Sequence, residues 1–302
     1  MTHVAVLMGG ISAEREVSLV SGEACALALE SCGYRVSRID AGRDLAARLA
    51  ELRPDRVFNA LHGRMGEDGR VQGLLDLMGL PYTHSGVLAS AIAMDKPMAK
   101  LIFESAGLRC AEGVEAELGS LKDELPLPPP VVVKPAAEGS SVGVTILLDG
   151  DVRPLFERND YDPATRVLVE RYVPGCELTC GVMGDRPLAV TEIRPTQGFY
   201  DYRAKYTEGY AVHDVPARLD PPVYAKVMDW ALRAHRALGC RGVSRADFRF
   251  NPEEGEDGLY ILEVNTQPGM TPLSLVPEQA AHCGIPFPEL VDRLVKEATC
   301  DR

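Results

Sequence analysis

The chain opens with the apolar run His3-Val4-Ala5-Val6-Leu7-Met8, which ends in Gly9-Gly10. A compact apolar segment of this length that stops at glycines is typical of a buried strand. Apolar residues then recur at helical spacing from about Ser12, and Gly33 marks the expected end of that helix. This order of strand and helix predicts the first unit of an α/β fold.

The same alternation continues to about residue 84. Segments 34–39 and 56–61 are predicted strands, and residues 70–78 are a predicted helix followed by Gly79. Alternating strands and helices favour a parallel sheet with helices on its faces. Ligands of such sheets bind beyond the carboxyl ends of the strands, which is where Gly9-Gly10 and His62-Gly63 fall.

The pattern changes after residue 84, so we expect three parts: 1–84, 85–170 and 171–302. The middle part begins with a helix over 95–105 that Asp95 caps, and Met98, Leu101 and Ile102 are expected to form its buried face. A stiff connector rich in proline follows. The strands predicted in the middle part are 131–134, 142–148 and 166–170.

Strands that look antiparallel dominate the last part, with a helix over 222–238 between them. The predicted strands are 177–183, 187–193, 242–250 and 259–265. Residues 196–211 have no regular period and are rich in aromatic side chains, which predicts a long loop. Loops of this length in compact domains are often functional lids.

Composition narrows the class of protein. The 302 residues include 44 acidic and 32 basic ones, a net charge of −12, which argues against binding to nucleic acid or anionic lipid. No apolar run approaches the roughly 20 residues that span a bilayer. Eight cysteines without a CxxC pair predict reduced thiols rather than a zinc site. We therefore expect a cytoplasmic enzyme or binding protein with no nucleic-acid or membrane partner.

The sequence lacks the usual nucleotide fingerprints. It has no Gly-Lys dipeptide, hence no Walker A loop, and no GxGxxG. It has instead Lys134-Pro135-Ala136-Ala137-Glu138-Gly139-Ser140-Ser141-Val142-Gly143, a loop of small residues that follows a strand. Small residues let backbone N–H groups approach phosphate oxygens, and the lysine adds a positive charge. A hairpin turn with a solvated lysine is the alternative interpretation.

Two neighbouring predicted strands carry polar side chains at two-residue spacing. Arg245 and Asp247 share one face of the first strand, and Glu263 and Asn265 share one face of the second. Carboxylate and amide oxygens suit Mg²⁺, which also binds substrate phosphates. Arg245 beside them can neutralise developing negative charge.

The alternative is that these charges only form the solvated side of a strand. Leu262 and Val264 alternate with the polar residues and are expected to face a core. A strand with one apolar face whose polar end runs into Thr266-Gln267-Pro268-Gly269 fits a site better than a plain surface.

Taken in order, these segments resemble the D-alanine–D-alanine ligase family of the ATP-grasp superfamily. The resemblance extends from end to end, apart from residues 108–130. It is carried by Gly9-Gly10-Ile11-Ser12-Ala13-Glu14-Arg15-Glu16-Val17-Ser18, Ala60-Leu61-His62-Gly63-Arg64-Met65-Gly66-Glu67-Asp68-Gly69, Met94-Asp95-Lys96, Lys134-Pro135 with Glu138 to Gly143, Phe199 to Tyr206, Ser244-Arg245-Ala246-Asp247 and Leu262-Glu263-Val264-Asn265-Thr266.

The resemblance implies a three-part ATP-grasp fold with a parallel-sheet N-terminal domain and ATP held between the central and C-terminal α+β domains. It also implies a reaction. ATP phosphorylates the carboxylate of one D-alanine, and the amine of a second D-alanine attacks the acylphosphate. A tetrahedral intermediate then releases phosphate and leaves D-alanyl-D-alanine for peptidoglycan precursors. Water must be excluded, because it would hydrolyse the acylphosphate.

The resemblance further implies which residues bind ATP. Lys96 and Lys134 match the two lysines that contact phosphates, where their charge offsets that of ATP. Glu170 matches the region that contacts adenine, and Glu177 matches the acceptor for the ribose hydroxyls. The loop between the predicted strands contributes Glu138, Ser140 and Ser141.

Asp247, Glu263 and Asn265 match the Mg²⁺ ligands of the family. Two ions are expected, Mn²⁺ is an expected substitute, and a monovalent cation is a candidate activator. Arg245 matches the residue that stabilises the oxyanion of the tetrahedral intermediate, a task that suits its permanent charge and planar fork.

Other matches concern D-alanine itself. Glu14 matches the residue that receives the ammonium group of the first D-alanine, and Ser140 and Tyr206 match a hydrogen-bond chain with it. His62 lies near the same pocket, either as a neutral hydrogen-bonding group or as a general base. The remaining substrate-binding matches are Lys205, Ser274 and Leu275, of which the last two hold the carboxylate of the second D-alanine.

Tyr206 favours the dipeptide over D-alanyl-D-lactate, because relatives that make the ester replace this tyrosine. Met65, His84 and Gln267 depart from the family pattern at positions with no implied role. The expected partner is D-alanine, and the expected assembly is a homodimer. Two alternatives stay open: an ATP-grasp ligase for a different small acid, and a nucleotide-binding regulatory protein without turnover.

Overall fold

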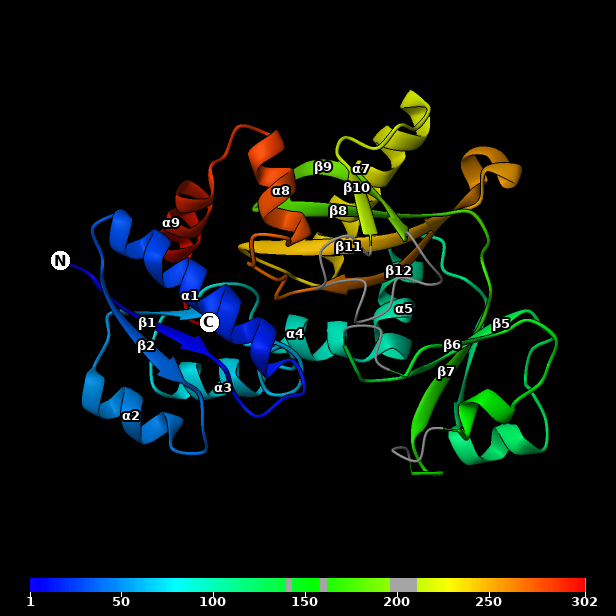
Figure 1. Ribbon diagram of the computed structural model, residues 1–302, viewed down its shortest axis with the longest axis horizontal. Coiled ribbons are helices and arrows are strands. Elements are labelled where there is room, and N and C mark those ends of the chain that lie inside the picture. The colour runs from blue at the N-terminus through cyan, green and yellow to red at the C-terminus, as the bar shows by residue number, and fades with distance from the viewer. Residues whose placement is uncertain (140–142, 158–161, 196–210, 302) are drawn as a thin grey trace.

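The computed structural model describes residues 1–139, 143–157, 162–195 and 211–301. These residues form three sheets, of three, four and five strands. Figure 1 shows the three-stranded and four-stranded sheets at opposite ends of the long axis, with the five-stranded sheet between and above them. Nowhere in these ranges is there a helix long and apolar enough to cross a membrane.

The first sheet has the order β2-β1-β3, and its strands are parallel, as the alternating pattern predicted. Every residue of its central strand is buried, which explains the unbroken apolar run at the start of the chain. The strands of this sheet and the helices between and after them are β1 (His3–Met8), α1 (Arg15–Ser31), β2 (Arg35–Asp40), α2 (Leu45–Leu52), β3 (Arg56–Asn59) and α3 (Arg70–Leu77).

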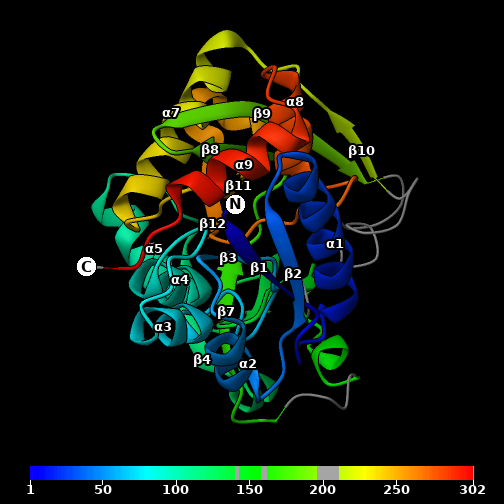
Figure 2. The same ribbon diagram turned by 90° about the vertical axis from the view of Figure 1, so that its left-hand side faces the viewer.

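The last helix of the chain returns to this first sheet. Leu290 and Leu294 of α9 (Phe287–Glu297) share a core with Leu29 of α1 and Phe58 of β3. Figure 2 shows α9 beside α1 and the three-stranded sheet. The sequence analysis predicted neither this helix nor α8 (Leu275–His282). The first sheet is therefore covered partly by the far end of the chain.

The four-stranded sheet is antiparallel, with the order β4-β7-β5-β6. Its first strand, β4, lies in the segment that resisted alignment and was not predicted. The predicted strand 142–148 is observed as Thr145–Leu147, and residues 140–142 lie outside the described part of the chain. The elements are β4 (Gly113–Glu117), η1 (Leu118–Lys122), β5 (Val131–Pro135), β6 (Thr145–Leu147), η2 (Arg153–Leu155) and β7 (Arg166–Arg171).

The five-stranded sheet is also antiparallel, with the order β10-β9-β8-β11-β12. Phe248 and Leu178 of this sheet share a core with Trp230 of the helix α7. The elements are β8 (Cys176–Met183), β9 (Arg186–Pro195), β10 (Ala211–Asp214), α7 (Pro221–Ala237), β11 (Val243–Phe250), η3 (Pro252–Gly258) and β12 (Leu259–Asn265).

Helices α4 (Val87–Met94) and α5 (Lys96–Ser105) also pack on the five-stranded sheet, since Ala93, Ala99 and Phe103 belong to its core. Helices that precede the proline-rich connector thus pack against strands that follow it. The boundaries 1–84, 85–170 and 171–302 remain a prediction.

The N-cap of α5 is as predicted, because Oδ1 of Asp95 accepts a 3.1 Å hydrogen bond from the backbone N–H of Met98. The predicted buried face is only partly right, because Ile102 is half-buried and packs against the core of the five-stranded sheet but Met98 and Leu101 do not. Met98 and Leu101 are 47% and 58% exposed. The buried side chains are those of Lys96, Ala99, Lys100 and Phe103. The positions of the apolar residues did not predict the buried face of α5 correctly, because Lys96 and Lys100 also lie on the side that packs.

Candidate active site

Two adjoining pockets lie beside the four-stranded and five-stranded sheets, and the N-terminal part of the chain lines one of them. The first, which we call the polar pocket, is lined from all three parts of the chain, for example by Glu14, Gly139 and Arg245. The second, which we call the apolar pocket, has walls that include Val132 and Ile146. The residues that line both pockets are Lys96, Glu138, Glu177, Asp247 and Glu263.

The two pockets contain every predicted site residue that the structure describes. Those in the polar pocket alone are Glu14, His62, Arg245, Asn265, Ser274 and Leu275. Lys134 and Glu170 line the apolar pocket alone. Ser140, Ser141, Lys205 and Tyr206 lie outside the described residues. Residues predicted from separate segments of the chain therefore meet in one place.

Arg245 and Asp247 lie two residues apart on β11 and form a forked ion pair. Nε of Arg245 donates to Oδ1 of Asp247 at 2.8 Å, and Nη2 donates to Oδ2 at 2.6 Å. Thr179 of the neighbouring β8 donates a further hydrogen bond to Oδ1 at 2.6 Å. Because a carboxylate held by several donors has little freedom to turn, the orientation of Asp247 is fixed before any ligand arrives.

The pairing of β11 with β12 aligns the predicted oxygen ligands. Glu263 lies opposite Asp247, and Asn265 lies opposite Arg245. The register then shifts between Asp247 and Phe248, where a β-bulge interrupts the ladder. The bulge overturns one expectation, because Leu262 is only half-buried and lines the apolar pocket instead of the core.

Lys96 connects the helix α5 to the loop that follows β5. Its Nζ donates to the carbonyl oxygen of Glu138 at 2.5 Å and lies 3.6 Å from Oε2 of Glu263. The side chain is buried, and it lines both pockets. An ammonium group at this point is suited to bind an anion that extends from one pocket into the other.

Glu170 lies at the end of β7 with two lysine partners. Its Oε1 is paired with Nζ of Lys100 and its Oε2 with Nζ of Lys134, and all three side chains are buried. Burial by itself would raise the pKa of the Glu170 carboxyl, but the cations of Lys134 and Lys100 hold that pKa below its ordinary value. The carboxyl is therefore ionised at neutral pH.

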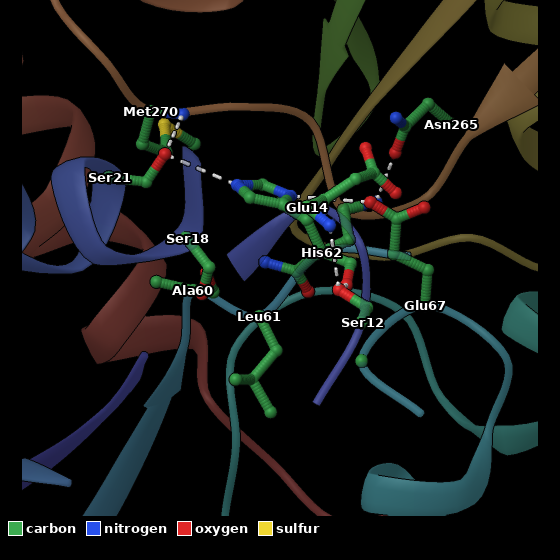
Figure 3. Close-up of polar contacts among 12 residues, drawn as sticks. Ser12, Glu14, Ser18, Ser21, Ala60, Leu61, His62, Glu67, Asn265 and Met270 are labelled. Atoms are coloured by element: carbon green, nitrogen blue, oxygen red, sulfur yellow. Dashed lines mark hydrogen bonds and ion pairs between the residues drawn. The ribbon is translucent and has the colours of Figure 1, made fainter. Parts of the chain in front are cut away.

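His62 lies in the polar pocket with both ring nitrogens engaged. Its Nδ1 is 3.3 Å from Oε1 of Glu67, and its Nε2 is 3.2 Å from Oγ of Ser21. Figure 3 shows Ser21 on one side of the imidazole ring, Glu67 on the other and Glu14 beside them. Gly63, with a φ of +66°, leaves room for the Glu14 carboxylate, which a side chain at that position would meet.

Comparisons with known proteins agree with this geometry. A sequence model described as D-ala D-ala ligase C-terminus matches residues 112–296, and one described as D-ala D-ala ligase N-terminus matches residues 38–85. The chain belongs to the D-alanine–D-alanine ligase family. The resemblance inferred from the sequence is thereby confirmed, together with the ATP-grasp architecture.

Individual members of the ligase family are similar over their whole length. The D-alanine–D-alanine ligase of Cereibacter sphaeroides is 57% identical over 301 residues, which cover 99% of this chain and 97% of the relative. The ligase of Sinorhizobium fredii is 55% identical over 303 residues, with 99% of each chain covered. A crystal structure of the Bacillus anthracis ligase complexed with ATP is 32% identical, has a TM-score of 0.80, and covers 98% of this chain and 96% of its own.

The three predicted oxygen ligands of this ligase-family chain fit Mg²⁺. Asp247, Glu263 and Asn265 supply two carboxylates and one amide oxygen to one pocket. Within the ranges that the structure describes, no group of three or more His, Cys, Asp or Glu side chains could hold a metal ion. A set with only two carboxylates is suited to an ion that retains water molecules and takes further ligands from phosphate, as Mg²⁺ does.

The structure of this ligase-family member also adds residues that the sequence analysis missed. Thr179, Ser21 and Glu67 contact predicted site residues, but no spacing in the sequence connects them to those partners. Lys100 is different, because it follows Lys96 by four residues on a predicted helix and so shares a face with it. That spacing could have identified Lys100.

Proposed function

We propose that this chain joins two D-alanines into D-alanyl-D-alanine, with conversion of ATP to ADP and phosphate, for peptidoglycan precursors. The observation that carries the proposal is the polar pocket, where Glu14, Arg245 and the Asp247–Glu263 pair come together from distant parts of the chain. The amine of a reactant would find the Glu14 carboxylate there, and its carboxylate and phosphate groups would find the cations of Arg245 and Lys96.

The apolar pocket is the proposed nucleotide site. Val132, Ile146 and Leu262 offer apolar contact for an adenine base, and Glu177, which lines the same pocket, would accept from ribose hydroxyls. Glu170, which also lines this pocket, is proposed to lie on its adenine side. The phosphates would extend past Lys134, Lys96 and Glu138 toward the polar pocket.

Mg²⁺ is the proposed metal, with Asp247, Glu263 and Asn265 as its protein ligands. Two ions are proposed, for which Mn²⁺ would substitute, and a monovalent cation is a proposed activator. When bound, the divalent ions would offset the charge of the ATP phosphates and hold them in line with the attacking carboxylate.

Glu14 is proposed to bind the ammonium group of the first D-alanine, and His62 to help shape that site. The second D-alanine would place its carboxylate at Ser274 and Leu275, where α8 begins. Backbone N–H groups at a helix start and a hydroxyl group together suit a carboxylate. Arg245 would donate to the oxyanion that forms when the amine attacks the acylphosphate.

Four proposed site residues lie outside the described part of the chain. Ser140 and Tyr206 are proposed to connect with Glu14 in a hydrogen-bond chain across the active site, Ser141 to bind phosphate and Lys205 to bind substrate. If so, Tyr206→Phe would raise the KM for D-alanine and let water reach the acylphosphate. Wild-type kinetics with no extra ADP release would argue against that chain.

A cytoplasmic homodimer that binds neither nucleic acid nor membrane is the proposed setting. The net charge of −12 supports the last two points, because such partners select for basic surfaces. Sedimentation of the purified chain would measure the oligomeric state directly.

The deciding experiment measures ADP release with Mg²⁺ and ATP in the presence of D-alanine, L-alanine, or D-alanine with D-lactate, and identifies products by mass. ADP matched one-to-one by D-alanyl-D-alanine, with nothing from L-alanine, is the expected result. ADP without dipeptide would indicate a ligase for a different acceptor. ATP binding without ADP formation would indicate a regulatory binding protein.

A further inference from the structure

Lys100 lies next to the proposed nucleotide site without lining it. Its Nζ pairs with Oε1 of Glu170 and donates to the carbonyl oxygen of Ala111 at 2.5 Å. The side chain is buried and absent from the walls of both the polar and the apolar pocket. It therefore acts on the pocket through Glu170 and not by contact with a ligand.

The buried cluster of Lys100, Glu170 and Lys134 holds two positive charges and one negative charge. Burial raises the pKa of the neighbouring Cys110 thiol to about 12, so that thiol is neutral and adds no charge. Buried ions are costly unless they are paired. One of the two lysines is thus in excess over the carboxylate that both of them contact.

Only one of the two lysines can reach a ligand. Lys134 lines the apolar pocket, whereas Lys100 is held on the far side of Glu170. If Lys134 were the sole partner of Glu170, a nucleotide phosphate would have to break a closed ion pair and leave a buried carboxylate without a counter-ion. With Lys100 in place, Glu170 stays neutralised when Lys134 turns toward a phosphate.

We propose that Lys100 is a positioning residue for nucleotide binding: it is the fixed counter-ion of Glu170 and thereby makes Lys134 available to ATP. The inference rests on the proposed function and deepens it at the nucleotide site. Lys134 is the exchangeable partner of Glu170, and Lys100 is the permanent one.

The surroundings of Lys100 support a fixed position. A side-chain carbon at Gly113 would lie 3.0 Å from Nζ of Lys100 and 3.1 Å from Cγ of Glu170, so the absence of a side chain there lets these two groups approach the sheet. Gly113 is also the residue directly opposite Glu170 in the pairing of β4 with β7. The backbone of β4 and the carbonyl of Ala111 thus confine the ammonium group.

The test is the Lys100→Met variant, with ATP affinity measured by calorimetry and the KM values for ATP and D-alanine measured separately. We expect ATP affinity to fall roughly tenfold, close to the lower end of the coupling between close charge pairs, while the KM for D-alanine changes less than twofold. Lys296→Met, at an exposed lysine of α9, is the matched control and should leave both values unchanged.

A second pair of variants separates charge from structure. Lys100→Gln keeps N–H donors for Ala111 and Glu170 but removes the positive charge, so it should lower ATP affinity as much as Lys100→Met does.

In the Glu170→Gln background, Lys100→Met should change ATP affinity less than twofold, because no carboxylate then competes with the ATP phosphates for Lys134. Thermal unfolding identifies any variant that has lost its fold, and Lys100→Gln, which removes the fewest contacts, is then the deciding variant.

Three results would overturn the proposal. The first is unchanged ATP affinity in folded Lys100→Met, and the second is wild-type ATP affinity in Lys100→Gln. The third is an equal loss of ATP affinity on Lys100→Met with and without the Glu170 carboxylate. Failure of the proposed function is distinct, since it would show as a wild-type chain that forms no D-alanyl-D-alanine. ATP binding can be measured on the wild-type chain in either case.

Discussion

Thr179 donates a 2.6 Å hydrogen bond from its hydroxyl to Oδ1 of Asp247 across the neighbouring strands β8 and β11. The same Oδ1 accepts from Nε of Arg245, whereas Oδ2 accepts from Nη2 of Arg245. Oδ1 therefore has two donors and Oδ2 has one. The oxygen with more remaining lone-pair capacity is Oδ2, so we expect Asp247 to offer that atom to a metal ion.

Replacement of Thr179 should weaken metal binding without direct contact to the metal. Thr179→Val preserves shape but removes a donor that orients Asp247, and loss of such outer partners typically costs about tenfold or more in metal affinity. We expect the Mg²⁺ concentration for half-maximal activity to rise about tenfold. Thr179→Ser keeps the hydroxyl and serves as the control. Equal Mg²⁺ dependence of the valine and serine variants would contradict this role.

Arg245→Ala should nearly abolish turnover. Removal of one oxyanion donor costs roughly 3–4 kcal/mol, and ATP affinity should stay within several-fold because Arg245 lines the polar pocket alone. Steady-state kcat and equilibrium ATP binding are the two measurements. Arg245→Lys keeps the charge but loses the fork to Asp247, and we expect it to recover little activity. An unchanged kcat in Arg245→Ala would refute the oxyanion role.

His62 should affect D-alanine more than ATP. The imidazole lies between Ser21 and Glu67 in the polar pocket and does not line the apolar one. His62→Ala removes a polar side chain from the wall of the polar pocket, and the loss of one hydrogen bond there, worth about 1 kcal/mol, should raise the KM for D-alanine roughly fivefold with the KM for ATP nearly constant. Parallel increases in both KM values would assign His62 to general stability instead.

His84 should make the fold sensitive to acid. Burial lowers the pKa of His84 to about 3, with His62 and Arg241 adding to the effect, so the side chain is neutral in the folded protein. The unfolded chain takes up a proton near the ordinary pKa of about 6.5. Above pH 6.5 the neutral His84 therefore costs no stability. As the pH falls from about 6.5 toward 3, the free energy of unfolding declines, by about 2 kcal/mol between pH 7 and pH 5.

Urea unfolding of wild-type chain and His84→Asn at several pH values would measure this decline. Asparagine tolerates the φ of +70° at this position and does not titrate, so the variant should show a shallower loss of stability below pH 6.5. Identical pH dependence in both proteins would mean that His84 contributes nothing to the acid response. A lower stability of the variant at pH 7 is compatible with either result, because His84 also contacts Gln267.

The contact between His84 and Gln267 joins two residues that have no evident relationship in the sequence. His84 and Gln267 both depart from the family pattern, and Nε2 of Gln267 lies 3.2 Å from Nδ1 of His84. Gln267 also donates to the backbone oxygen of Asn59, and its own N–H donates to Oδ1 of Asn265. Two residues that depart from the family pattern and lie 183 residues apart thus belong to one buried hydrogen-bond network, next to the proposed metal ligand Asn265.

The sequence by itself determined the α/β class, the parallel first sheet and most strands of the other two sheets, and it predicted site residues that the described part of the chain brings into two adjoining pockets. Strand and helix periodicity depends on neighbours in the chain, and the site residues sit in short motifs with characteristic chemistry. For the same reason the N-cap at Asp95 was predictable, since capping involves residues only three positions apart.

Only the tertiary structure decided which distant groups meet. The bulge that turns Leu262 into the apolar pocket, the buried face of α5, and the pairing of Lys100 with Glu170 depend on how separate sheets and helices pack. From the sequence alone a lysine is predicted to lie on the surface, because an unpaired ammonium group is costly to bury. A carboxylate 70 residues further along the chain removes that cost, and only the folded chain brings the two together.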